Sequence, residues 1–225
     1  MKDAIRAIVL ENGADVCGFA NIERFHDVPM EYHPSSIWKD CRTVIVFGIA
    51  LPKGFFEITS RLIYSHYNDL SIKAVDSLAF NAAKQIEEIG KIKAIPLPCD
   101  NPYEYWDKEN MEGHGLISNK KAAYFAGLGS IGKNKLLINK KFGNRLTLGV
   151  ILVDREIPSD DIPEELCLPN CQLCITSCPV GAITRESVIQ KKCRLHTYGK
   201  TTRGFDTVEC YQCRSVCPLR DGIKK

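Results

Sequence analysis

Apolar residues recur at helical spacing over residues 3–12, and Gly13 follows as a stop signal. The apolar stretch VCGFA, residues 16–20, then predicts a short buried strand. The longer run TVIVFGIAL, residues 43–51, is rich in β-branched residues and predicts a central strand. The pattern therefore predicts that the chain begins with one helix followed by two strands.

Further patterns continue this mixture of helices and strands. A helical pattern without Gly or Pro covers residues 59–89, and the extended segment KIKAIPLP follows it. The proline-rich, aromatic stretch at residues 96–110 predicts an irregular loop. Ser118 can cap a helix NKKAAYFA that stops at Gly127, and RLTLGVILVD, residues 145–154, is another β-prone run. Helices and strands around one sheet are therefore expected in this part of the chain.

The acidic, proline-containing segment EIPSDDIPEE predicts a linker, and cysteines become dense after it. We therefore predict an α+β protein with two domains, residues 1–162 and residues 163–225. The chain has 225 residues, of which 44% are hydrophobic and 25% are charged. This composition is typical of a soluble globular protein with one medium domain and a small appendage.

Charge and hydropathy narrow the range of partners. The net charge is only +3 and the basic residues are scattered apart from short lysine pairs, which favours a solvated surface over a nucleic-acid-binding face. The longest apolar run is far shorter than the roughly 20 residues of a membrane span. We expect a cytoplasmic protein with no membrane contact and no secretion signal. Its 11 cysteines should then be reduced and available as metal ligands.

Two cysteine runs in the tail each end on Cys-Pro. In two-cluster ferredoxins, the cysteine before proline binds the cluster whose other ligands come from the opposite run. The sequence therefore predicts two 4Fe–4S clusters, one held by Cys167, Cys171, Cys174 and Cys217 and the other by Cys193, Cys210, Cys213 and Cys178. The first gap, CLPNC, is one residue longer than usual, and Pro169-Asn170 within it is a natural turn pair that leaves the ligand count unchanged.

Zinc is the alternative metal for these cysteines. Two zinc sites would also use eight thiolates, but zinc sites usually combine two separated C-x2-4-C pairs instead of ending a triplet on Cys-Pro twice. The pattern favours clusters. Cys17, Cys41 and Cys99 stand alone in or beside apolar segments, and we interpret them as buried structural thiols.

A glycine-rich segment precedes the last strand, with Gly127, Gly129 and Gly132 in a G-x-G-x-x-G register. A dinucleotide fingerprint needs a strand before the first glycine and a helix after the last, whereas here a helix precedes and extended chain follows. Two interpretations stay open: a helix stop with a turn, or a close backbone approach to an anionic or amide-rich cofactor with Lys133 and Asn134 as donors.

The segment AGLGSIGKNKLLINKKFGNRLTLGVILVD resembles the cofactor-proximal segment of the epoxyqueuosine reductase family. GADVCGFA and TVIVFGIALP extend the resemblance over most of the chain. The resemblance implies a nitroreductase-like N-terminal domain that binds cobalamin and a ferredoxin-like C-terminal domain that passes electrons to cobalt, a plan shared with corrinoid reductive dehalogenases. It places cobalamin near Gly127, Gly129, Gly132, Lys133 and Asn134, with FMN as the alternative cofactor.

Two departures from the family pattern affect the expected substrate. The family carries a helical-repeat domain after the clusters that helps to hold tRNA, whereas this sequence ends eight residues after Cys217, so tRNA is not an expected partner. The family's catalytic aspartate falls where this sequence has Gly113-His114-Gly115. His114 is a candidate general acid or simply a surface group, and Asp100 and Asp107 are alternatives.

These observations predict a two-cluster redox protein that feeds electrons to cobalamin and reduces a small substrate. Its electrons would come from a donor such as a ferredoxin or flavodoxin. Two other functions stay open: an electron carrier or activator of another corrinoid protein, and a flavin-dependent reductase.

Overall fold

The computed structural model of the protein describes residues 1–100 and 102–223. Its centre is a four-stranded sheet in the order β1-β2-β8-β3, in which every neighbouring pair is antiparallel. The strands are β1 (Val16–Asn21), β2 (Thr43–Ala50), β8 (Leu146–Val153) and β3 (Ala94–Leu97). The strands expected from the apolar runs are confirmed.

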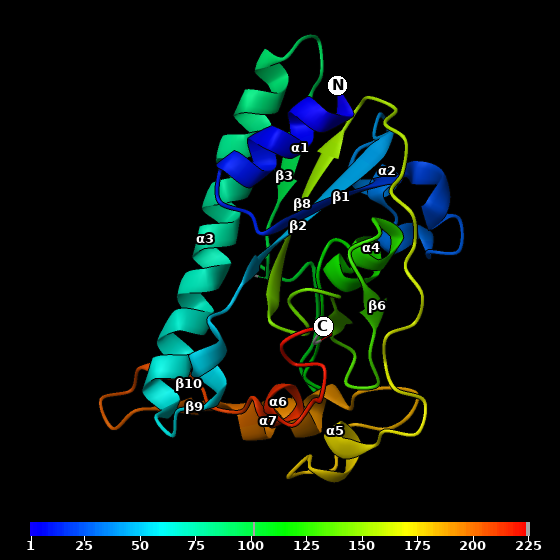
Figure 1. The fold of residues 1–225 in the computed structure, drawn as a ribbon. Coiled ribbons are helices and arrows are strands. Elements are labelled where there is room, and N and C mark those ends of the chain that lie inside the picture. The colour runs from blue at the N-terminus through cyan, green and yellow to red at the C-terminus, as the bar shows by residue number, and fades with distance from the viewer. Residues whose placement is uncertain (101, 224–225) are drawn as a thin grey trace.

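One face of the sheet packs against α1 (Lys2–Glu11) and α3 (Arg61–Glu88). Ile5, Phe19 and Phe47 lie in the core between these helices and the sheet, and each is fully buried. At 28 residues, α3 is about 42 Å long, so it continues past the sheet and contacts the cysteine-rich end of the chain (Figure 1).

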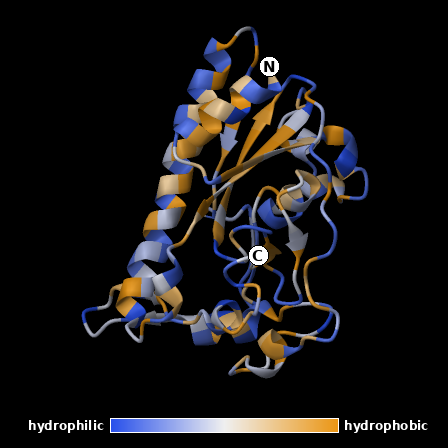
Figure 2. Ribbon diagram, in the orientation of Figure 1, coloured by the Kyte–Doolittle hydropathy of each residue, from blue (hydrophilic) through white to orange (hydrophobic). Residues whose placement is uncertain are grey.

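The other face packs against α4 (Asn119–Phe125), whose Ala122 and Ala123 join a second core with Val44 and Val46. Ser118 caps α4 as expected, because its Oγ accepts a hydrogen bond from the backbone N–H of Lys121 at 3.3 Å. Since helices cover both faces, the central strands are almost continuously apolar, and they appear mostly orange in Figure 2. Four short helices lie in the connections: η1 (Ile22–Phe25), η2 (Met30–Tyr32), α2 (Pro34–Ile37) and η3 (Lys53–Phe56).

Two small hairpins project from this sheet region. β6 (Ser130–Ile131) pairs with β7 (Leu137–Ile138), as expected for extended chain after the glycine segment. β4 (Tyr105–Asp107) pairs with β5 (Glu112–His114). The prediction of an irregular loop over residues 96–110 is therefore wrong for β4, because the pairing partner lies beyond the predicted loop; residue 101 lies outside the described residues.

The cysteine tail, residues 163–223, lies across one end of the molecule (Figure 1). It consists of short elements separated by turns: α5 (Leu173–Thr176), α6 (Gln190–Thr197), β9 (Tyr198–Lys200), β10 (Asp206–Val208) and α7 (Gln212–Ser215). The chain then turns back, and the N–H of Ile223 donates to the carbonyl of Lys140 at 2.9 Å. Arg145, buried under this return, pairs with Asp221 at 3.1 Å.

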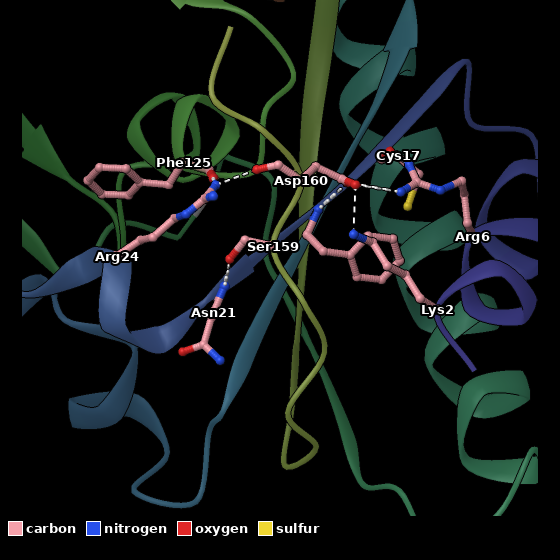
Figure 3. Close-up of polar contacts among 9 residues, drawn as sticks. Lys2, Arg6, Cys17, Asn21, Arg24, Phe125, Ser159 and Asp160 are labelled. Carbon is pink, nitrogen blue, oxygen red and sulfur yellow. Dashed lines mark hydrogen bonds and ion pairs between the residues drawn. The ribbon is translucent and has the colours of Figure 1, made fainter.

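The predicted linker has no helix or strand, yet Asp160 holds it against the sheet region (Figure 3). The Asp160 carboxylate accepts hydrogen bonds from Arg6 at 2.9 Å and from the N–H of Phe19 at 3.0 Å, and it pairs with Lys2 at 2.8 Å. Arg24 donates to the Asp160 carbonyl at 2.5 Å. Burial raises the pKa of the Asp160 carboxyl, but the hydrogen bonds from Lys2 and Arg6 outweigh it and lower the pKa below its usual value.

In the described part of the chain, no helix combines the length and the apolar character that a membrane crossing requires.

Candidate metal centre

The first cysteine run surrounds an open hollow at the boundary between the sheet region and the tail. The loop that begins this run turns at Pro169-Asn170, as expected, because the N–H of Cys171 donates to the carbonyl of Leu168 at 3.2 Å. The helix α5 starts just after Cys171 and carries Cys174. The residues that line the hollow are Lys133, Asn134, Ile138, Cys167, Leu168, Cys171, Cys174, Cys217, Pro218 and Leu219.

Cys217 belongs to the second run in sequence but lies in the hollow of the first run. Burial raises the pKa of the Cys217 thiol, and the neighbouring Cys167, Cys174 and Cys171 raise it further. Burial likewise raises the pKa of Cys174, with Cys167 and Cys171 as additional causes. These couplings and the shared hollow show that the fold brings together the four cysteines predicted for the first cluster.

Three of the four cysteines predicted for the second cluster also meet. Burial raises the pKa of Cys213, on α7, to about 11; Arg214 lowers it, while Cys210, Cys193 and, from the first run, Cys174 add to the rise. Cys193 comes from α6. The tail therefore folds so that the lone cysteine of α6 joins the second run.

Cys178, the fourth predicted ligand, differs from the other cysteines in its backbone surroundings. The N–H of Ala182 donates to Cys178 Sγ at 3.2 Å. Burial raises the pKa of this thiol, but hydrogen bonds from the backbone of Val180, Ala182 and Ile183 outweigh burial and lower the pKa. This turn therefore stabilises a thiolate, the form that binds metal.

The spacing of the thiols bears on which metal they suit. In a tetrahedral zinc site, sulfurs about 2.3 Å from one ion lie only about 3.8 Å apart. Within residues 1–100 and 102–223, no three His, Cys, Asp or Glu side chains are close enough together to hold a single ion. An all-thiolate donor set is used by iron–sulfur clusters and also by structural zinc sites.

Protein groups fill the spaces beside the glycine-rich segment. Gly127 has φ +78°, and a Cβ there would lie 2.5 Å from the carbonyl oxygen of Asp161. A Cβ at Gly129 would lie 2.2 Å from the carbonyl oxygen of Ile138, and one at Gly132 would lie 2.8 Å from the Ile138 side chain. The close backbone approach expected for these glycines is therefore an approach to the linker and to β7.

Lys133 and Asn134 direct their side chains to the cysteine tail. Lys133 Nζ donates to the carbonyl oxygens of Leu168 at 2.8 Å, Pro169 at 2.5 Å and Cys171 at 2.9 Å. Asn134 Nδ2 donates to the carbonyl oxygen of Cys213 at 3.1 Å. The cofactor-binding role of this segment stays a prediction, and in the described structure the side chains of Lys133 and Asn134 contact the tail.

The candidate acids lie around the β4–β5 hairpin. His114 packs between the rings of Tyr32 and Tyr105, with centroid distances of 5.4 Å and 5.5 Å. Asp107 accepts hydrogen bonds from the backbone and side chain of Asn110, which lower its pKa. Asp100 accepts a hydrogen bond from Tyr103 Oη at 3.3 Å. Asp100 also lines a pocket with Leu97 and Asn119, whereas the cysteine hollow has a different lining.

Sequence reasoning missed Arg194, which joins this hairpin to the second cysteine group. Its guanidinium lies 5.0 Å from the ring centre of Trp106 and 5.2 Å from that of Tyr103. Gln190, one turn earlier on α6, accepts from the N–H of Gly113 at 3.2 Å. The partners are about 80 to 90 residues apart in sequence, so no local pattern could have indicated the contact.

A curated sequence matches this chain over most of the chain's length. The epoxyqueuosine reductase of Lactococcus garvieae is 30% identical over 202 residues, which cover 84% of this chain. The chain is an epoxyqueuosine reductase-like protein. It spans about half of that relative, 55% of its length. No protein-family model matches the chain.

Solved structures show that this fold is shared with two groups of reductases. An epoxyqueuosine reductase crystallised with an epoxyqueuosine-modified tRNA-Tyr stem loop superposes on 98% of this chain and 65% of its own, with a TM-score of 0.68 and 17% identity. A reductive dehalogenase structure, described as suggesting a mechanism for B12-dependent dehalogenation, covers 96% of this chain and 31% of its own, with a TM-score of 0.71 and 19% identity. The epoxyqueuosine reductase-like chain thus has a mixed α/β fold common to redox reductases.

The expectation that tRNA is not a partner is wrong. It depended on the helical-repeat domain that the family carries after the clusters. The epoxyqueuosine reductase solved with a tRNA stem loop superposes on nearly the whole of this epoxyqueuosine reductase-like chain, and the curated relative bears the same enzyme name. These relatives overturn the exclusion of tRNA.

Proposed function

We propose that the chain is an iron–sulfur reductase whose two 4Fe–4S clusters pass single electrons to a corrinoid bound by the sheet region. Cluster one is held by Cys167, Cys171, Cys174 and Cys217, and cluster two by Cys193, Cys210, Cys213 and Cys178. The observation that supports this proposal most strongly is the place of Cys217 in the hollow of the first run, because crossed ligands are the arrangement of two-cluster ferredoxins.

In this proposal the two parts of the chain have different tasks. Residues 163–225 form a ferredoxin-like domain that binds the clusters, and residues 1–162 form a nitroreductase-like domain that positions the second cofactor. The raised pKa values of Cys174, Cys213 and Cys217 mean that cluster assembly releases protons from these thiols. The tail then holds the clusters beside the sheet region.

The corrinoid part of the proposal is supported by the B12-dependent dehalogenation named for a structural neighbour of the chain. When bound, a corrinoid supplies a cobalt centre that accepts electrons and reacts with substrate. Because the side chains of Lys133 and Asn134 are already engaged with the tail, we assign them no step at the cobalt. Arg194 and Gln190 hold the β4–β5 hairpin next to cluster two.

We propose a tRNA stem loop carrying epoxyqueuosine as the first substrate to test, because the relatives bear that name and one was solved with such a stem loop. A second function, electron carrier or activator of another corrinoid protein, is favoured by a different observation. Neither of the acid candidates on the β4–β5 hairpin, His114 and Asp107, is among the described residues that line the cysteine hollow.

Anaerobic calorimetric titration with cobalamin and with FMN, followed by single turnover with the modified stem loop, separates these functions. The proposal expects cobalamin to bind and the stem loop to be reduced by the dithionite-reduced protein. If cobalamin binds but the stem loop is not reduced, the function to test next is a corrinoid-dependent reduction of a small substrate. Reducible clusters with binding of neither cofactor would establish the electron carrier instead, and binding of FMN alone would establish the flavin enzyme.

A further inference from the structure

The Lys133 ammonium has all of its donors occupied by one loop of the tail. An ammonium group carries three N–H donors. Lys133 Nζ makes three hydrogen bonds, to the carbonyl oxygens of Leu168, Pro169 and Cys171, at 2.5 to 2.9 Å. The loop that receives these bonds is the CLPNC gap with its additional residue. Lys133 therefore has no donor left for a second ligand.

The same ammonium belongs to the wall of the cluster-one hollow. Of the ten described residues that line this hollow, Lys133 is the only one with a cationic side chain. It comes from the turn between β6 and β7, which is closed where the N–H of Lys135 donates to the carbonyl of Gly132 at 2.8 Å. The three hydrogen bonds to the tail hold the ammonium in place at the end of this turn.

We propose that Lys133 is a positioning residue of cluster one that raises the reduction potential of this cluster; the inference rests on the proposed two-cluster function. Reduction transfers one electron from an external reductant, such as dithionite, to the cluster, and no bond to the protein forms or breaks. The cluster and its four thiolates are already anionic, so the reduced form carries one more negative charge. A fixed positive charge in the wall of a partly buried site stabilises the reduced form more than the oxidised form.

The three hydrogen bonds of Lys133 also explain why its charge should affect the potential of cluster one and not that of cluster two. They fix the carbonyls of the 168–171 turn toward the ammonium, so the backbone on either side of Cys171 is held in one orientation. The neighbouring Asn134 is neutral and contacts the Cys213 carbonyl of the second group. Removing the charge at Lys133 should therefore change cluster one and leave cluster two as an internal reference.

The test is an anaerobic redox titration of the holoprotein with dithionite, followed by electron paramagnetic resonance, on wild type, Lys133→Gln and Lys133→Arg. Gln keeps hydrogen-bond donors without the charge, and Arg keeps the charge. Cys217→Ala identifies which signal belongs to cluster one. We expect Gln to lower the potential of cluster one, Arg to keep it near the wild-type value, and cluster two to stay unchanged in both. Lys135→Gln, two residues along the same turn, is the matched control and should shift neither potential.

An unchanged cluster-one potential in Lys133→Gln with full iron content would overturn the inference, as would equal shifts of both clusters. Loss of half the iron in both Lys133→Gln and Lys133→Arg would overturn it too, because the role would then be purely structural. If Gln loses the cluster and Arg retains it at the wild-type potential, the charge requirement is supported. Wild-type protein without any cluster would contradict the proposed function first, and that outcome is seen before any variant is made.

Discussion

The sheet region and the cysteine tail differ in how much apolar surface each one buries. In the sheet region, large side chains such as Phe19, Phe47 and Ile151 are fully buried, and cores lie on both faces of the sheet. In the described part of the tail, α5, α6 and α7 bury no residue, and Ala182 and Ile183 are its buried apolar residues. A segment of this size without a core needs another source of stability, and the proposed clusters would provide it.

The contacts between the two regions are also of a different kind. The tail meets the sheet region largely through polar contacts, such as the N–H of Val208 with Ser65 Oγ at 2.9 Å and Tyr211 Oη with the Ile58 carbonyl at 2.5 Å. A small apolar cluster around Phe56 and Tyr64 adds to them. The comparison predicts that the sheet region keeps its structure without the proposed clusters, whereas the tail does not.

The largest expected effect follows from removing the iron. Anaerobic chelation should abolish amide hydrogen-exchange protection in α6 and α7, because the cysteines then no longer tie these helices together. Protection in β2 and β8 should persist, since both lie in the apolar core. Hydrogen exchange followed by mass spectrometry measures both regions in one experiment. If the tail stays protected from exchange without iron, the predicted difference between the two regions is wrong.

Loss of one crossed ligand should affect half of the metal. Cys217→Ala removes the ligand that comes from the second run, so the variant should hold about half of the wild-type iron and keep the signal of cluster two. Cys17→Ala is the matched control, because Cys17 is buried in the sheet region and should leave the iron content unchanged. Iron analysis and electron paramagnetic resonance give the answer. Loss of the cluster-two signal with retention of cluster one would refute the assignment.

A cavity in the sheet core should weaken that region without touching the metal. Phe47→Ala removes a fully buried ring between β2 and α3 and should lower the free energy of unfolding of the sheet region by about 3–5 kcal/mol. Phe80→Ala, on the exposed side of α3 at 58% exposure, should cost much less. Urea unfolding followed by circular dichroism measures the difference. Iron content per folded chain should match wild type in both variants, and a parallel loss of iron would show that the two regions are not independent.

The smallest expected effect concerns the contacts by which Asp160 holds the predicted linker against the sheet region. Asp160→Asn should cost about 2 kcal/mol at neutral pH, because it removes the charge that accepts hydrogen bonds from Arg6 and pairs with Lys2. The pKa of Asp160 is lowered from 3.8, so its contribution is present above that pH and is lost as the pH falls below it, through the folded-state value. Urea unfolding of the iron-free chain at neutral and acidic pH tests this. The exposed neighbour variant Asp161→Asn should behave as wild type, and a deficit of Asp160→Asn that persists in acid would contradict the account.

The sequence predicted the sheet region well because its signals are local. Continuous apolar runs gave β1, β2 and β8, and unbroken helical spacing gave α3. The β4–β5 hairpin was missed because Tyr105 and Trp106 show no alternation with polar residues that would mark a strand, and the strand is only three residues long. The contacts of Asp160 with Arg6 and Phe19 join residues about 140 to 160 positions apart, and no local sequence pattern reveals such contacts.

The candidate site shows the same limit. Cysteine spacing and the Cys-Pro endings indicated that Cys217 would cross to the first run, and it does line the hollow of that run, whereas the place of Cys178 in the second cluster stays a prediction. The glycine-rich segment did not indicate which group packs against it. A glycine permits close approach to a cofactor or to protein backbone equally well, and only the fold shows that Gly129 faces the carbonyl of Ile138 and that Lys133 faces the tail.

Metal and sulfide content tests the central claim, that the tail is held by two crossed iron–sulfur clusters, most directly. Protein purified without oxygen should contain close to eight iron atoms and eight acid-labile sulfides per chain, with little zinc, because eight cysteines of the tail supply four ligands to each cluster. Stoichiometric zinc without sulfide in freshly prepared anaerobic protein would contradict the account.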